Sequence, residues 1–417
     1  MRQPFRHPGP LVAALLLAAL AALAVSAGSC ARSAKKQQVV FWITWPIEAV
    51  RPIEQRYEAL NKNINVKLVA MPWQSLHDSL TAALAAGTPP DLCQLHSTDL
   101  APFMSGGSLS DWSAGVADLR PALRGWPMVM VGDAIYGLPW LLRTQVLYWN
   151  RELFFQAKLG PARGPQTWDE LREAAIAIQR RRGGVHGYGL AVTDSGAAFR
   201  AVVPYLFGNG GALINDMFDS SRVDSPENLQ ALEFLQSLRP YTLLASDDSL
   251  SREFAAGRLG MLLAGSELAV QLQRSSPSLS YGMELVPQPG AGVGSHAGLA
   301  AGEVLVSFTN SRRKEDALRL ARFLVQDDNE HALATRLHFM QPSTLTADTA
   351  AWYRARPEQQ VMLRQLDVAR YLPNHRDWAA MHRVLANELG GAIGGWRGAH
   401  AALATADTFV SKRLESR

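Results

Sequence analysis

The feature that most constrains the fold is the alternation of strand-like and helix-like segments that begins at residue 39. Three short runs have the β-branched and apolar composition of buried strands: 39–43, 64–68 and 91–95. Between them, apolar residues recur at helical spacing in 53–60 and 76–84. Pro52 is expected to start the first of these helices, because proline disrupts a helix interior. This β-α-β-α-β order predicts a parallel sheet whose ligand site lies beyond the carboxyl ends of its strands.

The residues that follow these three strands are aromatic and mostly uncharged. They are Trp45 and Glu48 after the first strand, Trp73 after the second, and Gln94 and His96 at the third. Such a rim suits a polyhydroxy ligand, because aromatic rings stack on the C–H faces of a sugar and polar side chains bind its hydroxyls. The alternative for each tryptophan is packing beneath a loop, which is as common as ligand contact.

Size and charge exclude several classes of protein. A chain of 417 residues predicts two domains, and 47% hydrophobic residues with 19% charged residues is a globular composition. The formal net charge of +4 includes Arg2 and Arg6, which lie in a segment expected to be removed. No run of five or six like charges is present, so a nucleic-acid partner is not expected.

The N-terminus predicts export. Arg2 and Arg6 precede an apolar run at 11–25 that is too short to span a bilayer, and small residues follow up to Cys30. Residues 1–29 are therefore interpreted as a signal peptide. The ending AGSC resembles a bacterial lipobox, with Ala27 where leucine is usual, and this resemblance implies cleavage before Cys30 and a lipid anchor on its thiol. The alternative is plain cleavage near Ala27.

Two further inferences follow from the N-terminal prediction. Residues 30–38 are polar and small, as expected of a tether between anchor and domain. With Cys30 acylated, Cys93 is the remaining cysteine, so no intrachain disulfide is expected.

The stretch 135–153 is predicted to connect two α/β halves. Gly137 and Pro139 suggest a turn, and Trp140 and Arg143 follow it as candidates for ligand contact. Residues 146–149 form a β-prone run that ends at a favoured helix N-cap residue.

The second half offers further candidates on loops. Asn209, Gly210 and Gly211 lie in a glycine-rich loop, but no Walker pattern follows, so close approach to a neutral ligand or a plain turn explains it equally well. Ser266 and Glu267 follow a buried run, and Glu303 precedes another. No zinc motif, nucleophile elbow or nucleotide loop is present, so neither a metal nor a cofactor is expected.

Several motifs together resemble one family, the extracellular solute-binding proteins of ABC importers, in the sugar-binding branch related to maltose- and glycerol-3-phosphate-binding proteins. In chain order they are AALAAGTPPDL (82–92), GGSLSDW (106–112), YGLP followed by LYWNRELF (136–154), TWDEL (167–171), FAAGRLGMLLAGS (254–266), and GEVLVSF with the helix after it (302–324).

The resemblance implies an α/β fold of the periplasmic-binding-protein type II, in which two Rossmann-like lobes are joined by a hinge with the ligand cleft between them. The implied division is 39–145 plus 304–345 for the N-terminal lobe and 146–303 plus 346–417 for the C-terminal lobe. It also implies a monomer that delivers a carbohydrate or sugar phosphate to ABC permease subunits outside the cytoplasmic membrane. The positions that match the family's binding segments are Trp45, Glu48, Gln94, His96, Trp140, Arg143, Asn209–Gly211, Ser266, Glu267, Arg376 and Trp378. Two positions depart from the family pattern, namely Glu267 in place of a frequent tryptophan and Trp149 in place of a tyrosine.

Four functional hypotheses remain open on the sequence. The first is capture of a sugar, from mono- to oligosaccharide. The second is capture of glycerol 3-phosphate or a glycerophosphodiester, favoured if Arg143 and Arg376 converge on one oxyanion. The third is a secreted glycosidase, which would need two of Glu48, Glu267 and Glu303 to flank a glycosidic bond. The fourth is a sensor module that presents ligand to a receptor.

Overall fold

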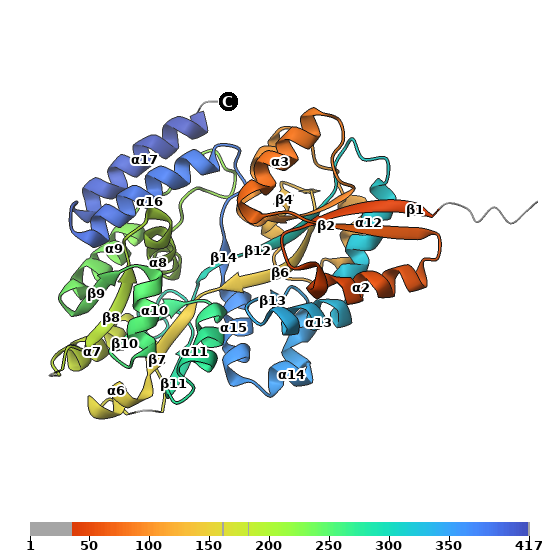
Figure 1. The fold of residues 1–417 in the computed structure, drawn as a ribbon. Helices are drawn as coiled ribbons and strands as arrows, with labels where there is room; N and C mark the ends of the chain where they lie inside the picture. The colour runs from red at the N-terminus through yellow and green to blue at the C-terminus, as the bar shows by residue number, and fades with distance from the viewer. Residues whose placement is uncertain (1–35, 161, 182, 416–417) are drawn as a thin grey trace, which may run out of the picture.

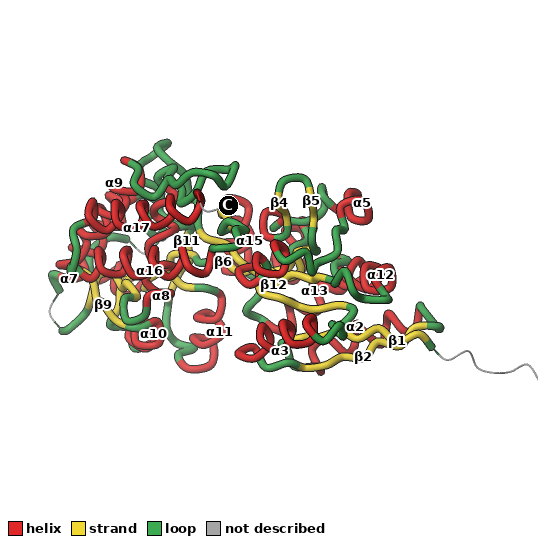
Figure 2. The backbone as a smooth tube through the Cα atoms, turned by 90° about the horizontal axis from the view of Figure 1, so that it is seen from above, coloured by secondary structure: helices red, strands yellow, loops and turns green. Residues whose placement is uncertain are grey.

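The computed structural model describes residues 36–160, 162–181 and 183–415. The signal peptide predicted at 1–29 and the lipidation site Cys30 lie outside these residues. The chain forms two α/β bodies that lie side by side, with strands β6 and β12 running between them (Figure 1; Figure 2). Among the described helices, none combines the length and apolar character that a membrane crossing needs.

The first body is built on a seven-stranded sheet in the order β13-β6-β12-β3-β1-β2, with β14 paired to β12. Its strands are β1 (Gln37–Ile43), β2 (Ile64–Ala70), β3 (Leu92–His96), β6 (Leu138–Thr144), β12 (Leu299–Val306), β13 (Gln341–Pro342) and β14 (Arg370–Tyr371). Strand β1 pairs in parallel with both β2 and β3. The predicted β-α-β-α-β unit is therefore confirmed, with β1 at its centre.

The helices of the first body cover this sheet as their apolar faces require. The longer ones are α2 (Ile47–Leu60), α3 (Trp73–Ala85), α12 (Lys314–Leu324) and α13 (Asp327–Leu337). The shorter ones are η1 (Ser97–Asp99), α4 (Ala101–Ser105), α5 (Ser113–Val116), η2 (Ala117–Leu119) and η3 (Trp126–Met128), beside the small sheet of β4 (Met130–Val131) and β5 (Ala134–Ile135). Val39, Phe41 and Ile43 of β1 point into the core that these elements enclose.

The expected start of the first helix was wrong. Helix α2 begins at Ile47, after Pro46 in the N-cap position, and Pro52 lies inside it. A proline there removes the hydrogen bond to the carbonyl of Glu48. Because Glu48 is exposed, water can reach this part of the helix, which lowers the cost of the missing bond. Gly87 adopts a φ of 69° after α3, as the predicted C-cap requires.

The second body is built on a five-stranded sheet in the order β11-β7-β10-β8-β9. Its strands are β7 (Val146–Asn150), β8 (His186–Ala191), β9 (Thr242–Ala245), β10 (Leu259–Ala264) and β11 (Tyr281–Glu284). Its helices are α6 (Arg151–Gln156), α7 (Trp168–Gln179), α8 (Ser195–Gly208), α9 (Pro226–Leu238), η4 (Arg239–Tyr241), α10 (Asp247–Ala255), α11 (Ser266–Ser275), α16 (Trp378–Gly394) and α17 (Ala399–Glu415). The Oδ1 atom of Asn150 accepts a hydrogen bond from the amide of Leu153, so its predicted N-cap role is confirmed.

The chain passes between the two sheets at three places in the described residues. Strand β6 ends at Thr144 and β7 begins at Val146, so Gln145 alone separates a strand of one sheet from a strand of the other. The chain returns between β11 and β12, and it leaves again after β14 towards α16 (Figure 1).

The elements after β13 lie beside this junction. They are η5 (Leu345–Thr349), α14 (Ala351–Arg354) and α15 (Pro357–Val368). Gln365 of α15 binds the amide of Val286 and the carbonyl of His296, each at 2.8 Å. The helix therefore braces the second crossing. Strand β12 begins at Leu299 and belongs to the first sheet along its whole length, so that sheet also takes residues that we assigned to the C-terminal lobe.

Candidate ligand-binding site

A cavity of about 790 Å³ opens at the junction of the two bodies. This volume lies within the range of small-molecule sites, about 300–1,000 Å³. The first body contributes η1 and the ends of β3 and β6, and the second contributes α8, α10, β10, α11 and α16. Its polar, charged and aromatic lining includes His96, Thr98, Asp99, Arg143, Gln145, Phe199, Arg200, Asp247, Asp248, Glu267, Trp378 and His382.

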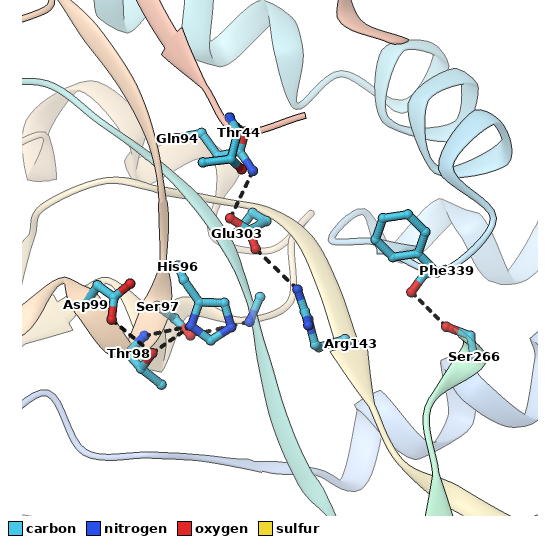
Figure 3. A network of polar contacts seen from close by, with 11 residues as sticks. Thr44, Gln94, His96, Ser97, Thr98, Asp99, Arg143, Ser266, Glu303 and Phe339 are labelled. Carbon is cyan, nitrogen blue, oxygen red and sulfur yellow. Dashed lines mark hydrogen bonds and ion pairs between the residues drawn. The ribbon is translucent and has the colours of Figure 1, made fainter. Parts of the chain in front are cut away.

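The wall from the first body is polar and follows the carboxyl end of β3. The Nδ1 atom of His96 lies 2.7 Å from Oγ1 of Thr98, and this hydroxyl donates to Asp99 at 3.4 Å (Figure 3). Burial, and then the charge of Arg143, lower the pKa of His96 to about 3, so its ring is neutral. Burial raises the pKa of Asp99. Trp73 packs edge-on against the His96 ring with centroids 5.5 Å apart, and 44% of its surface is exposed.

A chain of hydrogen bonds holds Arg143 at the floor of the cavity. Its Nη2 atom donates to Oε1 of Glu303 at 3.4 Å, and the Nε2 atom of Gln94 donates to the other oxygen at 2.9 Å (Figure 3). Gln94 in turn accepts from the amide of Thr44 at 3.0 Å. Burial raises the pKa of Glu303 to about 7, although Gln94 and Arg143 act in the opposite direction. Gln94 and Glu303 thus support the cavity from behind Arg143.

The wall from the second body is aromatic. Phe199 of α8 and His382 of α16 meet with their rings T-shaped and their centroids 4.5 Å apart. Trp378, at the start of α16, lies 6.0 Å from His382 and 6.3 Å from Phe199. Burial, and then the charge of Arg200, lower the pKa of His382, which favours its neutral form. Phe199 and Trp378 are 1% and 3% exposed, so their rings pack in the second core behind the lining, and the partly exposed His382 is the ring that reaches the cavity. We call these three rings together the aromatic wall.

The upper edge of the cavity carries charged side chains from three helices. Arg200 of α8 forms an ion pair with Asp247 of α10 at 2.9 Å. Asp248 follows on α10, and Glu267 lies in the first turn of α11. Both helices begin directly after strands of the second sheet, which brings their first residues to the cavity.

Four of the predicted site residues line this cavity: His96, Arg143, Glu267 and Trp378. Trp73 and Glu303 do not line it but contact His96 and Arg143, which do. Gln94 lies one residue further back and contacts Glu303.

The other predicted aromatic contacts are corrected by the structure. Trp140 is 0% exposed and Trp45 is 7% exposed, and their rings pack against each other at 4.6 Å inside the first core. The expected turn at Gly137–Pro139 was wrong in part, because β6 begins at Leu138 and carries Trp140 into the sheet. The side chain of Trp140 therefore points into the core instead of into the cleft.

Four further predicted segments lie outside the lining of this cavity. Glu48 is exposed in the first turn of α2. In the glycine-rich loop, Asn209 donates to the carbonyl of Glu227 at 2.7 Å, Gly210 has a φ of 84°, and Gly211 accepts from Arg370 at 2.7 Å, so this loop joins α8 to α9. Ser266 donates to the carbonyl of Phe339 at 2.7 Å, and Arg376 pairs with Asp377 at 3.4 Å.

Several lining residues were missed by sequence reasoning, namely Thr98, Asp99, Gln145, Phe199, Arg200, Asp247, Asp248 and His382. A usable signal existed for two of them. Asp247 and Asp248 follow a strand and an N-cap serine, Ser246, so the rule that ligand sites lie at strand carboxyl ends points to them. Phe199 and His382 lie inside helices, where their spacing is indistinguishable from that of core residues.

Two α/β bodies on separate sheets, joined by three crossings with a cavity at the junction, define the two-lobed binding-protein class predicted from the sequence. Residues 53–361 match the family model described as bacterial extracellular solute-binding protein. The chain belongs to this family, and the family is extracytoplasmic.

Named relatives agree with this assignment. The chain is 27% identical over 290 residues to a binding protein of Brucella abortus, covering 66% of this chain and 68% of that one. It is 21% identical over 321 residues to the sn-glycerol-3-phosphate-binding periplasmic protein UgpB of Salmonella typhimurium, covering 72% of this chain and 73% of the relative. The structure of the cyclic alpha-maltosyl-1,6-maltose binding protein from Arthrobacter globiformis superposes with a TM-score of 0.83 at 22% identity, covering 92% of this chain and 100% of that one.

Proposed function

We propose that this protein is the substrate-binding subunit of an ABC importer and that it captures a sugar, from mono- to oligosaccharide. The observation that carries the proposal is one cavity between the two bodies that hydrogen-bonding side chains line from both sides, with the ring of His382 beside them. His96, Thr98 and Arg143 would bind the hydroxyls of a sugar, and the His382 ring would contact its C–H surface. The relatives that bind sugars and sugar phosphates support the same class.

Capture would proceed by closure of two lobes, divided as 39–145 plus 304–345 and 146–303 plus 346–417, except that residues 299–303 of β12 and strand β14 move with the sheet of the first lobe. A ligand that touches both walls binds the closed form more tightly than the open form, and this difference shifts the population towards closure. The single residue Gln145 between β6 and β7 limits how far the backbone must change. The closed form would then be the one that the permease recognises.

The arrangement gives less support to glycerol 3-phosphate. That alternative required Arg143 and Arg376 to converge on one oxyanion. Arg143 lines the cavity, whereas Arg376 is exposed, pairs with Asp377 and lies outside the lining. One guanidinium, that of Arg143, therefore remains for the ligand, with the buried carboxyl group of Glu303 behind it.

We propose that the protein binds its ligand without catalysing a reaction. Of the three carboxylates considered for glycoside cleavage, Glu267 lines the cavity, Glu48 is exposed outside it, and Glu303 is buried behind Arg143. A glycosidase needs two carboxylates within about 5–10 Å of each other across the substrate. Release of the chromophore from a nitrophenyl glycoside by the purified protein would contradict this part of the proposal.

We also propose that Cys30 carries the lipid that anchors the protein to the membrane and that the protein acts as a monomer. The lipobox-like ending before Cys30 supports the anchor. A sensor module that presents ligand to a receptor would use the same cleft. Binding of the ligand-loaded protein to its permease, measured in membrane vesicles, separates the two roles.

Isothermal titration calorimetry against a panel of monosaccharides, disaccharides and maltodextrins, with glycerol 3-phosphate and glycerophosphocholine beside them, tests the proposal. We expect heat of binding with at least one carbohydrate. Binding of a glycerophosphate alone would replace the sugar by the second class. Absence of heat with every member of the panel would contradict both.

A further inference from the structure

More carboxyl groups than guanidinium groups line the cavity, and this difference indicates the charge of the ligand. Two lining side chains are permanently cationic, Arg143 and Arg200, and each already faces a carboxylate. Arg143 lies 3.4 Å from Glu303, and Arg200 lies 2.9 Å from Asp247. Among the described lining residues, Arg200 is therefore offset by Asp247, whereas Glu303 offsets the charge of Arg143 only where it is ionised, above its raised pKa of about 7.

Three lining carboxyl groups have no cationic partner, namely Asp99, Asp248 and Glu267. Asp99 accepts a hydrogen bond from Thr98, and burial raises its pKa, which favours its neutral form. Asp248 and Glu267 line the cavity from α10 and α11, and no hydrogen bond or ion pair joins either side chain to the described part of the chain. The lining histidines do not compensate them, because burial lowers the pKa of both His96 and His382 below the ordinary value. The open cavity therefore has an excess of negative charge.

Closure around a ligand would make this excess costly. A carboxylate that loses water without gaining a hydrogen-bonded cation is strongly destabilised. A neutral sugar offers only hydroxyl donors, and a phosphate ester adds repulsion. A protonated amine satisfies the carboxylates, because its N–H groups donate charge-assisted hydrogen bonds to them.

We propose that the ligand of this cavity is an amino sugar, that is, a polyhydroxy solute with a protonated amine, and that Asp248 and Glu267 select positive charge over negative. This inference rests on the proposed function, since it takes the cavity as the sugar site. It goes further by naming the charge of the ligand and the two residues that recognise it.

Two series of sugars with matched stereochemistry test the charge preference. They are glucosamine, glucose and glucose 6-phosphate, and galactosamine, galactose and galactose 6-phosphate. Affinities are measured by calorimetry at pH 6, where the amine is protonated, at low salt and at about 0.5 M salt. In at least one series we expect the amino sugar to bind about fivefold or more tightly than the neutral sugar, the phosphate ester to bind most weakly, and salt to reduce the difference.

Substitutions assign the preference to residues. The double variant Asp248→Asn, Glu267→Gln should reduce the preference for the amino sugar to less than about twofold, because both charges are gone while the shapes are kept. Glu233→Gln is the control: Glu233 is exposed on α9, outside the cavity lining, and its loss changes the net charge by one, against two in the double variant. The ratio of affinities should stay at the wild-type value in this control.

The outcomes separate this inference from the function on which it rests. If the phosphate ester or the neutral sugar binds as tightly as the amino sugar, the inference is overturned and sugar capture stands. If the double variant keeps the full preference, Asp248 and Glu267 are not the selecting residues and the inference is overturned as well. If no sugar of either series and no oligosaccharide of the larger panel binds, the proposed function fails, and this inference fails with it.

Discussion

The guanidinium of Arg143 and the carboxyl group of Glu303 lie on the adjacent strands β6 and β12, with Nη2 and Oε1 3.4 Å apart. The side chain of Arg143 is 40% exposed towards the cavity, whereas that of Glu303 is 1% exposed. The strand pairing shifts register between Glu303 and Val304, where a bulge re-aims the side chains. One residue thus faces the ligand while the other, held by Gln94, fixes its direction.

Replacing Arg143 by methionine should weaken ligand binding by about tenfold or more, since a charged hydrogen-bond donor is lost from the cavity while much of the aliphatic chain is kept. Arg143→Lys keeps the charge without the planar fork and should recover part of the affinity. Calorimetry with whichever sugar binds the parent protein measures both. Equal affinity of the methionine variant and the parent would remove Arg143 from the site.

The stability of the protein should depend on pH through Glu303. Its folded pKa of about 7 lies above its ordinary value of 4.5, so the folded state binds the extra proton between these values. The resulting stability is fully present below pH 4.5 and is lost as pH rises through 7, by up to about 3 kcal/mol. Glu303→Gln should flatten this part of the curve in urea denaturation.

A second carboxyl group serves as the comparison for that experiment. Burial, and then its neighbour Glu58, raise the pKa of Glu54 to about 7. Glu54→Gln should therefore remove the contribution of Glu54 to the dependence of the unfolding free energy on pH. It should leave ligand affinity unchanged, because Glu54 lies on α2, outside the cavity lining. A slope in Glu303→Gln identical to that of the parent would contradict the assignment.

Loss of the His382 ring should lower sugar affinity through the aromatic wall. His382→Ala removes the ring that touches Phe199 at 4.5 Å, and we expect a loss of about fivefold to tenfold in affinity. The control is His400→Ala, which removes an exposed histidine of α17 outside the cavity lining. The two variants should differ in affinity and agree in far-ultraviolet circular dichroism.

The tryptophans of the first body should divide into a structural and a peripheral class. Trp45→Ala opens a cavity beside Trp140 in the core, and we expect it to cost about 3–5 kcal/mol of unfolding free energy. Trp73→Ala removes a half-exposed ring beside His96 and should lower the unfolding free energy far less. It should weaken the binding of ligands that are long enough to extend past His96. Equal stabilities of the two variants would contradict this division.

The proposed anchor predicts a change of location without a change of binding. Cys30→Ser should move the protein from the membrane fraction to the soluble fraction of the envelope and abolish labelling by a radioactive fatty acid. Cys93→Ser is the matched control, since Cys93 is buried within β3 and should not be labelled. Retention of the serine variant in the membrane would argue for a different attachment.

Much of the fold could be predicted because it depends on local patterns. The strands of the first body were found from β-branched runs, and Asn150 was recognised as a cap from its residue type and position. The site was harder to predict, because burial decides between core and cleft and burial is not a local property. Trp140 and Trp378 are both large, apolar in their surroundings and nearly inaccessible, yet one packs on Trp45 and the other lines the cavity.

The ion-pair partners of charged residues could not be predicted from the sequence for the same reason. Arg143 and Arg376 carry the same charge, and the sequence does not reveal that Glu303 stands behind one and Asp377 beside the other. These pairings depend on which strands become neighbours. Asp248 lies just beyond the carboxyl end of β9, where ligand sites of α/β sheets are expected, so its sequence position did indicate the site.

Gln145 is a single-residue connection between the two sheets, so it can serve as a pivot when the lobes rotate. For a rotation about an axis near that residue, each atom moves in proportion to its distance from the axis, so Arg143, close to Gln145 in the chain, shifts less than residues farther away. Contacts near the axis therefore change little on closure, whereas contacts far from it form and break with the motion. Substitutions near the axis can therefore change the affinity for the solute, and substitutions far from it can change the rate of release.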